Sequence, residues 1–151
     1  MSDTFRLWTH GVAVQVEYED FFRNVRIRRA GFGTDIQQNG GTWNWFHLAI
    51  PSASTLDDDT ADHYHAYLRG YVNNYAVVEE VNVHESQGGN ASPRIYHAGG
   101  LNWTGRTLNE NFNLPDAICS GPLCMSVRVR FDDSRGRVRF VGAGAWFEER
   151  T

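Results

Sequence analysis

The chain has 151 residues and a formal net charge of −4 at pH 7, and all 14 of its basic residues are arginine. Without lysine it lacks the group that forms Schiff bases, anchors pyridoxal phosphate or completes a phosphate-binding loop of the Gly-Lys-Ser/Thr type. Hydrophobic residues make up 41% of the sequence, which is enough for a packed core and excludes a disordered chain. The modest net acidity argues against a nucleic-acid binder, and no apolar run is long enough to cross a bilayer.

Period-two alternation dominates the first half of the chain and indicates β-strands. We expect strands at Val12–Tyr18, Val25–Arg28 and Trp43–Ile50. Gly31-Phe32-Gly33 predicts a bend after the second strand, and Gln37–Gly41 has the composition of a turn. Because Trp43–Ile50 is apolar on both faces, we predict that it lies at the centre of a sheet.

Alternation continues in the second half, with turn residues at regular intervals. Strands are expected at His63–Val72, Val77–His84, Arg94–His97, Leu108–Leu114, Leu123–Phe131 and Arg137–Phe147. The turn sequence Asp132–Gly136 predicts that the last two strands form a β-hairpin. With no linker and no internal repeat, residues 1–151 are predicted to form a single all-β domain. Eight to nine strands favour a two-sheet antiparallel β-sandwich of jelly-roll type, with a closed barrel as the alternative.

The N-terminus has no basic segment followed by an apolar stretch, so a secretory signal is not expected. A cytoplasmic location is predicted, with a non-standard export route left open. Cys119 and Cys124 have no second cysteine pair to complete a metal site. Gly121-Pro122 would allow a local disulfide, but two free thiols in a reducing compartment are favoured.

Three stretches carry a resemblance to a known family: Val25–Thr34, Asn44–Pro51 and the final strand, which is broken by Gly142 and Gly144. From about Val12 onward the chain resembles an uncharacterised bacterial family of small β-sandwich proteins. The resemblance implies the fold. It implies no activity, because none is assigned to that family.

His63 and His65 are two residues apart on a predicted strand, so they should point to the same side. They follow the acidic stretch Asp57–Asp62, in which Asp59 and Asp62 could complete a metal shell. Cupin metal sites have the same histidine spacing, but the downstream glutamate of that pattern is missing here. The favoured interpretation is an exposed strand face beside a solvated acidic loop.

Trp43, Trp45 and His47 share one face of a predicted strand, with Tyr64 or Tyr67 as neighbours. Exposed, they would form a stacking platform for sugar rings; buried, they would belong to the core, which we favour because the opposite face is also apolar. Trp103, in a glycine-rich loop, is the better candidate for an exposed ligand-binding aromatic residue.

Arg128, Arg130, Arg137 and Arg139 alternate with inward-facing apolar residues in the last two predicted strands. A hairpin would bring all four onto one outer face, where like charges opposed across strands need compensation. They could pair with Glu17, Glu19, Glu79 or Glu80, form a subunit contact or bind an anion.

No serine elbow, paired-carboxylate signature or zinc-protease motif is present, and Gly142-Ala-Gly144 lies inside a strand, so it is not a nucleotide fingerprint. These glycines instead predict that Trp146 or another backbone segment approaches the strand closely. The leading hypothesis is a non-enzymatic protein without a cofactor that acts through self-assembly or a protein partner. A carbohydrate-binding, lectin-like module is the alternative, and a metal-dependent enzyme or metal-binding protein is third.

Overall fold

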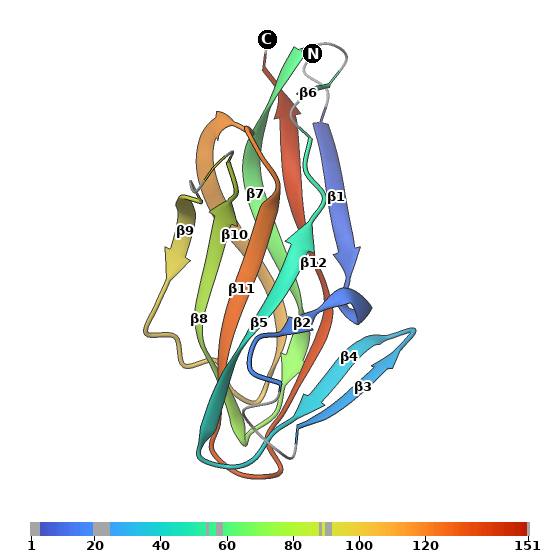
Figure 1. The fold of residues 1–151 in the computed structure, drawn as a ribbon, viewed down its shortest axis with the longest axis vertical. Coiled ribbons are helices and arrows are strands. Elements are labelled where there is room, and N and C mark those ends of the chain that lie inside the picture. Colours follow the sequence, from blue (N-terminus) through green and yellow to red (C-terminus); the bar gives the residue numbers. More distant parts are fainter. Residues whose placement is uncertain are drawn as a thin grey trace.

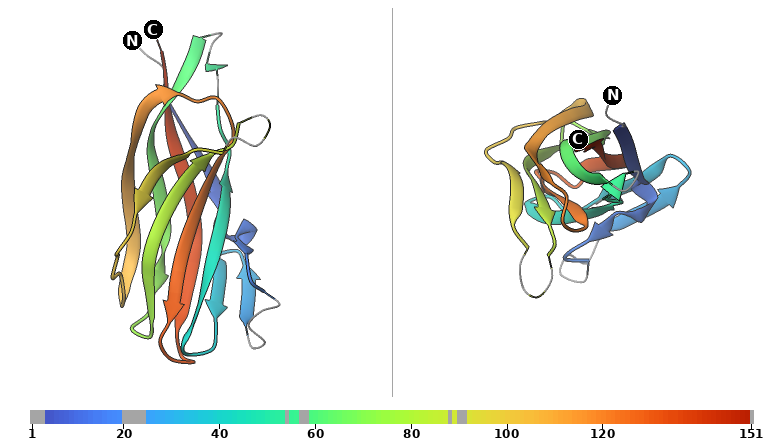
Figure 2. Two further views of the ribbon diagram at one scale, coloured as in Figure 1. Left: turned by 60° about the vertical axis from the view of Figure 1, so that its left-hand side comes forward. Right: turned by 90° about the horizontal axis from the view of Figure 1, so that it is seen from above.

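Two antiparallel β-sheets pack face to face in the computed structural model, which describes residues 4–19, 25–53, 55–56, 59–87, 89 and 92–150 (Figures 1 and 2). The predicted two-sheet β-sandwich of jelly-roll type is confirmed, with more strands than the eight to nine expected. No described helix is long and apolar enough to span a membrane.

One sheet has seven strands, and β12 pairs with three of the others. β12 pairs with β7 along one edge, while its other edge pairs first with β4 and then with β1. The strands of this sheet are β1 (Thr4–His10), β3 (Arg26–Ala30), β4 (Gly33–Gln37), β6 (Thr55–Leu56), β7 (Asp59–Val72), β10 (Arg106–Ile118) and β12 (Arg137–Glu149).

The other sheet has five strands in the order β2-β5-β11-β8-β9. Their bounds are β2 (Gln15–Val16), β5 (Thr42–Ile50), β8 (Ala76–Glu85), β9 (Arg94–Ala98) and β11 (Leu123–Phe131). β5 therefore has only the two-residue β2 beyond it, and the prediction that it is a central strand is wrong. Its outward face is open enough that Trp43 keeps 38% of its surface exposed.

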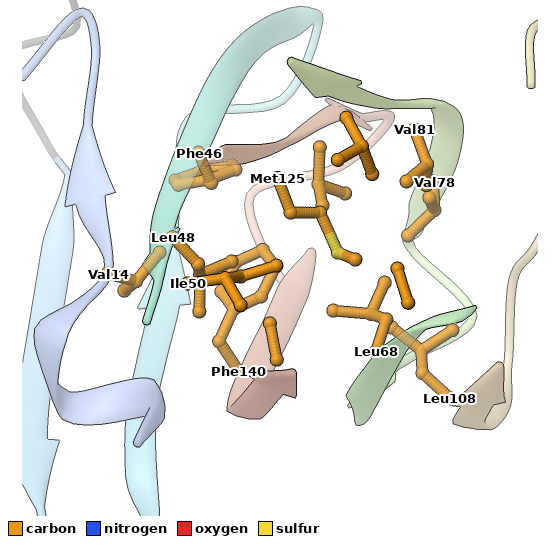
Figure 3. Packing of buried hydrophobic residues seen from close by; sticks show 14 of the residues in the cluster. Val14, Phe46, Leu48, Ile50, Leu68, Val78, Val81, Leu108, Met125 and Phe140 are labelled. Carbon is orange, nitrogen blue, oxygen red and sulfur yellow. The ribbon is translucent and has the colours of Figure 1, made fainter. Parts of the chain in front are cut away.

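The core lies between the sheets and is built from alternate residues of nearly every strand (Figure 3). Phe46 of β5 meets Phe140 of β12 across the sandwich with ring centroids 5.2 Å apart. Leu68 and Met125 are fully buried, one from each sheet. Burying each such side chain stabilises the fold by about 1.5–3 kcal/mol.

The predicted C-terminal hairpin is wrong. β11 belongs to the five-stranded sheet and β12 to the seven-stranded sheet, so residues 132–136 cross between the sheets. This crossing packs against the β7–β8 turn, where the side chain of Asn73 donates to the carbonyl of Arg135 and accepts from the amide of Arg137. The inward pattern of Val129 and Val138 is the same for a hairpin and for a crossing, because both place apolar residues toward one core.

The strand predicted at Val12–Tyr18 is also largely wrong, since a 3-10 turn at Gly11–Ala13 precedes the short β2. Here the chain passes from one sheet to the other, so only Val14 of its alternating residues is fully buried. The close approach requires Gly11, because an added β-carbon would lie 1.8 Å from the carbonyl oxygen of Phe140. β1 and β4 were not predicted, since neither has a run of alternating apolar residues.

Candidate functional site

The antiparallel register aligns residues of β10, β7, β12 and β1 into three rows on the outer face of the seven-stranded sheet. The rows are Asn109–Arg69–Gly142–His10, Asn111–Tyr67–Gly144–Trp8 and Asn113–His65–Trp146–Arg6. The intervening residues, such as Leu68 and Ala145, face the core and are buried. Strand alternation thus separates an apolar inner face from an outer face of aromatic rings, amides and guanidinium groups.

The last two rows form a cavity of about 420 Å³, named here the aromatic groove. It is lined by Arg6, Trp8, His65, Tyr67, Arg69, Asn111, Asn113 and Trp146. Trp8 stacks on Tyr67 with centroids 5.2 Å apart and planes at 21°, and His65 stacks on Trp146 at 5.2 Å and 29°. Although Tyr67 is only 6% exposed, Trp8 above it remains 45% exposed. The groove therefore presents a large ring that is both accessible and held in place.

Gly144 allows Trp8 to lie flat across β12. A β-carbon at this position would lie 2.8 Å from two ring carbons of Trp8 and 2.7 Å from the carbonyl oxygen of Leu7. The predicted close approach of another backbone segment is confirmed, since the backbone of β1 and the Trp8 ring approach Gly144, but the suggestion that Trp146 is the approaching residue is wrong. Since β1 pairs only with β12, this contact also fixes the edge strand that supplies one side of the groove.

Two guanidinium groups lie on these rings. Arg6 sits over Tyr67 and Trp146 at 5.8 and 5.4 Å, and Arg69 sits over Trp8 and Tyr67 at 5.4 Å each. Arg69 also donates to two backbone carbonyls and to Oδ1 of Asn111 at 3.1 Å. Burial lowers the pKa of Arg69, but a guanidinium remains charged at any physiological pH. Cation–π contacts thus place two fixed positive charges in the groove.

The structure separates the predicted metal ligands. Trp146 and Phe147 are consecutive in β12, but they pair with His65 and His63, which are two residues apart in β7. Tyr64 is therefore an extra residue in β7, and the two histidines lie on opposite faces of the sheet. His63 is buried with its Nε2 3.1 Å from Oε2 of Glu85 in the other sheet. The prediction that both histidines point to one side is wrong because a β-bulge reverses the alternation.

The acidic members of that set are also apart. Asp62 pairs with Arg150, whose Nε lies 3.3 Å from Oδ2 of the aspartate. Asp57 and Asp58 lie outside the described residues, as does the side chain of Asp59. In the part of the chain that the structure describes, no three histidine, cysteine, aspartate or glutamate residues are grouped so as to hold a metal ion.

The four arginines predicted to share one face are divided between the two sheets, because their strands are not paired with each other. Arg130 pairs with Asp132 and with Glu79, the latter at 3.6 Å, and Arg128 lies over the ring of Trp43 at 4.5 Å. Arg137 and Arg139 lie in the seven-stranded sheet, where Arg139 pairs with Asp35 at 2.7 Å. The single basic ladder predicted from the sequence does not exist.

The three predicted tryptophans lie away from the groove, and Tyr67, which was expected beside Trp43 and Trp45, lines the groove on the other sheet. Trp43 and the half-buried Trp45 belong to the outer side of the five-stranded sheet, so their assignment to the core is wrong. Trp103 is half-buried, stacks on Phe112 at 6.3 Å and carries Arg106 over its ring. It packs against the core and is less exposed than either Trp8 or Trp43.

Cys119 and Cys124 are free thiols. Burial raises the pKa of both, which keeps them protonated and makes them poor nucleophiles.

The sequence contained signals for the groove that we did not use. Outward asparagines recur at every second position of β10, and Tyr67 and Arg69 alternate with buried residues in β7. This pattern of large polar side chains on an outer strand face could have indicated a binding surface. Trp8 carried no such signal, because β1 is an edge strand without regular alternation.

The chain belongs to a family of unknown function, DUF6623, whose model matches residues 2–145. This confirms the predicted membership of an uncharacterised family. No curated protein matches the sequence.

Among solved structures, the chain is similar to a family 29 carbohydrate-binding module from Piromyces equi, with 6% identity, a TM-score of 0.44, and 95% of this chain and 90% of that one covered. It is also similar to the CBM36-1 domain of a multidomain xylanase from the hindgut metagenome of Trinervitermes trinervoides, with 12% identity, a TM-score of 0.43, and coverages of 99% and 98%. A family two carbohydrate esterase from Cellvibrio japonicus matches at 13% identity and a TM-score of 0.43, over 99% of this chain and 35% of that one. At these sequence identities and TM-scores, the matches do not indicate the function of this chain.

Proposed function

We propose that this protein binds glycan chains through the aromatic groove on the outer face of its seven-stranded sheet. The observation that carries the proposal is the Trp8 ring, which is 45% exposed while stacked on Tyr67 at 5.2 Å. A large exposed aromatic ring costs solvation free energy, and in a groove such a ring is typical of a binding site.

The groove offers both kinds of contact that a sugar needs. The C–H face of a pyranose ring is apolar and packs against an aromatic ring, while its hydroxyl groups donate and accept hydrogen bonds at the edge. Asn111 and Asn113 line the groove beside the rings, and their amides can both donate and accept. Self-assembly, the leading hypothesis from the sequence, stays a prediction, but the arginine ladder that motivated it is not formed.

The binding test uses a panel of soluble plant, microbial and animal polysaccharides in affinity gel electrophoresis, followed by isothermal titration calorimetry with oligosaccharides of the polymers that retard the protein. Truncating an anchor ring at a hot spot costs about 2 kcal/mol or more, so Trp8→Ala should weaken binding by roughly 30-fold. Trp43→Ala is the matched control, since Trp43 is 38% exposed on the opposite sheet and should leave affinity within about twofold.

Equal losses from both variants would place the binding surface elsewhere. A loss from Trp43→Ala alone would support the alternative considered for the strand of Trp43, a platform for sugar rings on the five-stranded sheet. Retention of affinity in a folded Trp8→Ala protein, or no binding across the whole panel, would overturn the proposal.

A further inference from the structure

The outer face of the seven-stranded sheet continues beyond the aromatic groove into a cluster of arginines. Two rows of residues cross β12, β4 and β3 on this face. They are Arg139–Asp35–Arg28 and Arg137–Gln37–Arg26. We name these four arginines the arginine patch: Arg26, Arg28, Arg137 and Arg139. A cleft of about 280 Å³ lies among them, lined by Arg26, Arg28, Asp35, Gln37 and Arg137.

Among the described residues that line this cleft, three arginines accompany a single carboxylate, Asp35. Asp35 is occupied by Arg139, which donates from Nε and Nη2 to its two carboxylate oxygens at 2.7 and 3.0 Å. Asp35 also attracts Arg137 and Arg28 electrostatically, but among the described residues no ion pair joins a carboxylate to Arg26, Arg28 or Arg137. Like charges on neighbouring strands repel, so an anion bound between them would relieve that repulsion.

A further feature prepares the arginine patch for an anion. Arg139 and Arg28 both lie over the ring of Phe32 in the β3–β4 turn, at 4.1 and 5.5 Å, which restricts where their guanidinium groups can move. Side chains that are already held in place lose less conformational entropy when they bind a ligand.

The groove and the patch lie along the same strand. β12 pairs with β4 from Arg137 to Phe140 and with β1 from Gly142 to Glu148, so the two sites follow one another along it (Figure 1). Tyr71 is 36% exposed and lies opposite Arg139, so it extends the outer face beside the arginine patch. At the rise of a β-strand, Arg137 and Gly144 are on the order of 20 Å apart, a span that one oligosaccharide can cover.

We propose that the glycan bound by this face is acidic, with uronic-acid carboxylates held by the arginine patch and a sugar ring packed on Trp8. This inference rests on the proposed function and names its ligand class. Carboxylate is favoured over other anions because the patch already binds one, Asp35, in the two-point geometry that a guanidinium group prefers. A nucleic acid is disfavoured because the protein as a whole carries a net charge of −4.

Matched polymers test the charge requirement. Polygalacturonate, polymannuronate and hyaluronate are each compared with their carboxyl-reduced forms, which keep the same linkages without the charge. At least one uronate should bind at least about tenfold more tightly than its reduced form, because charge-assisted hydrogen bonds are roughly twice as strong as neutral ones. That affinity should fall as salt is raised from 50 to 300 mM.

Matched double variants locate the charges. Arg28→Gln combined with Arg137→Gln should weaken uronate binding at least about tenfold and leave binding of the reduced polymer unchanged. Arg128→Gln combined with Arg130→Gln removes the same charge from the opposite sheet and should leave both affinities within about twofold. Thermal unfolding of each variant confirms that it is folded before binding is compared.

The outcomes separate the two proposals. Equal binding of the uronate and reduced polymers overturns the inference and leaves the proposed function standing. Binding of other polysaccharides in the panel without binding of any uronate does the same, whereas no binding across the whole panel overturns both. Tighter binding of dextran sulfate or of a single-stranded oligonucleotide than of any uronate overturns the assignment to carboxylated sugars. Equal losses from the two double variants would reduce the effect to overall charge.

Discussion

The two outer faces of the sandwich use similar residues in opposite ways. On the five-stranded sheet, polar side chains satisfy one another: His47 contacts Ser126 at 2.7 Å and Glu17 at 3.2 Å, while Asn82 contacts Glu80 at 2.7 Å and His97 at 2.6 Å. On the seven-stranded sheet, Arg6 and Arg69 lie on aromatic rings and form no ion pair with a carboxylate among the described residues.

This difference indicates which face is built to receive a ligand. A hydrogen-bonded network of surface groups is already close to its lowest free energy, so a ligand must replace bonds that the protein has made. Arginines without carboxylate partners can form new charge-assisted bonds without breaking old ones. The five-stranded face is not uniform, since Arg128 lies over the ring of Trp43 at 4.5 Å and its buried Nε has no hydrogen-bond partner among the described residues. Tyr18 contacts the same ring edge-on at 5.5 Å.

The largest expected effect is a loss of stability that leaves glycan binding unchanged. Glu85 and His63 are 5% and 2% exposed and join the two sheets, so Glu85→Ala leaves a buried polar partner unsatisfied. We expect a loss of about 3 kcal/mol of unfolding free energy, and hence a fall in melting temperature on the order of 10 °C. Glycan affinity at 20 °C should be unchanged, because the pair lies on neither outer face.

Glu79→Ala is the control for that change, since Glu79 is 26% exposed and only 3.6 Å from Arg130. A surface pair of this kind contributes about 0–1 kcal/mol. If Glu85→Ala and Glu79→Ala unfolded at the same temperature, the buried pair would contribute no more than a surface pair.

A second change should disturb one face and spare the other. Gly144→Val would place a side chain where Trp8 and Leu7 already lie, with contacts of 2.7–2.8 Å from the first added carbon. Such overpacking costs about 1–3 kcal/mol of stability. Displacing Trp8 should also weaken glycan binding as strongly as Trp8→Ala does, as measured by calorimetry on the folded protein.

Gly31→Ala is the matched control, because nothing lies within 4 Å of the added carbon. It should leave both stability and affinity close to those of the parent. Full glycan affinity in Gly144→Val would mean that the position of Trp8 on β12 does not matter for binding.

The sequence predicted the sandwich well because burial imposes a period of two over most of the length of strands such as β5 and β11. It could not predict which sheet each strand joins. Val129 and Val138 face the same core from opposite sheets, and alternation is identical in the two arrangements. The error in the arginine ladder followed directly from this ambiguity.

The candidate site was harder to predict, for two physical reasons. A single extra residue at Tyr64 places His63 and His65 on opposite faces, and no local composition marks that bulge. The groove, moreover, combines strands distant in sequence: Trp8 is near the N-terminus, Tyr67 in the middle and Trp146 near the C-terminus. Their proximity is a property of strand pairing, which residue spacing does not encode.

The smallest expected effect concerns the one carboxylate in the arginine patch. The hydrogen bonds from Arg139 hold the pKa of Asp35 below its ordinary value, so at neutral pH the carboxylate is ionised and occupies Arg139. Asp35→Asn removes this negative charge and frees Arg139, while the amide oxygen can still accept one hydrogen bond. Uronate affinity should therefore rise about threefold, a gain of less than 1 kcal/mol typical of one partly exposed charge. Affinity for the carboxyl-reduced polymer should not change, and the gain should shrink as salt is raised.

Because the pair contributes stability only above the folded-state pKa of Asp35, the parent should lose its small stability advantage over Asp35→Asn as pH falls through that value. Calorimetry with both polymers at two salt concentrations measures the binding effect, and a loss of uronate affinity would show that Asp35 positions Arg139 for the ligand instead of competing with it.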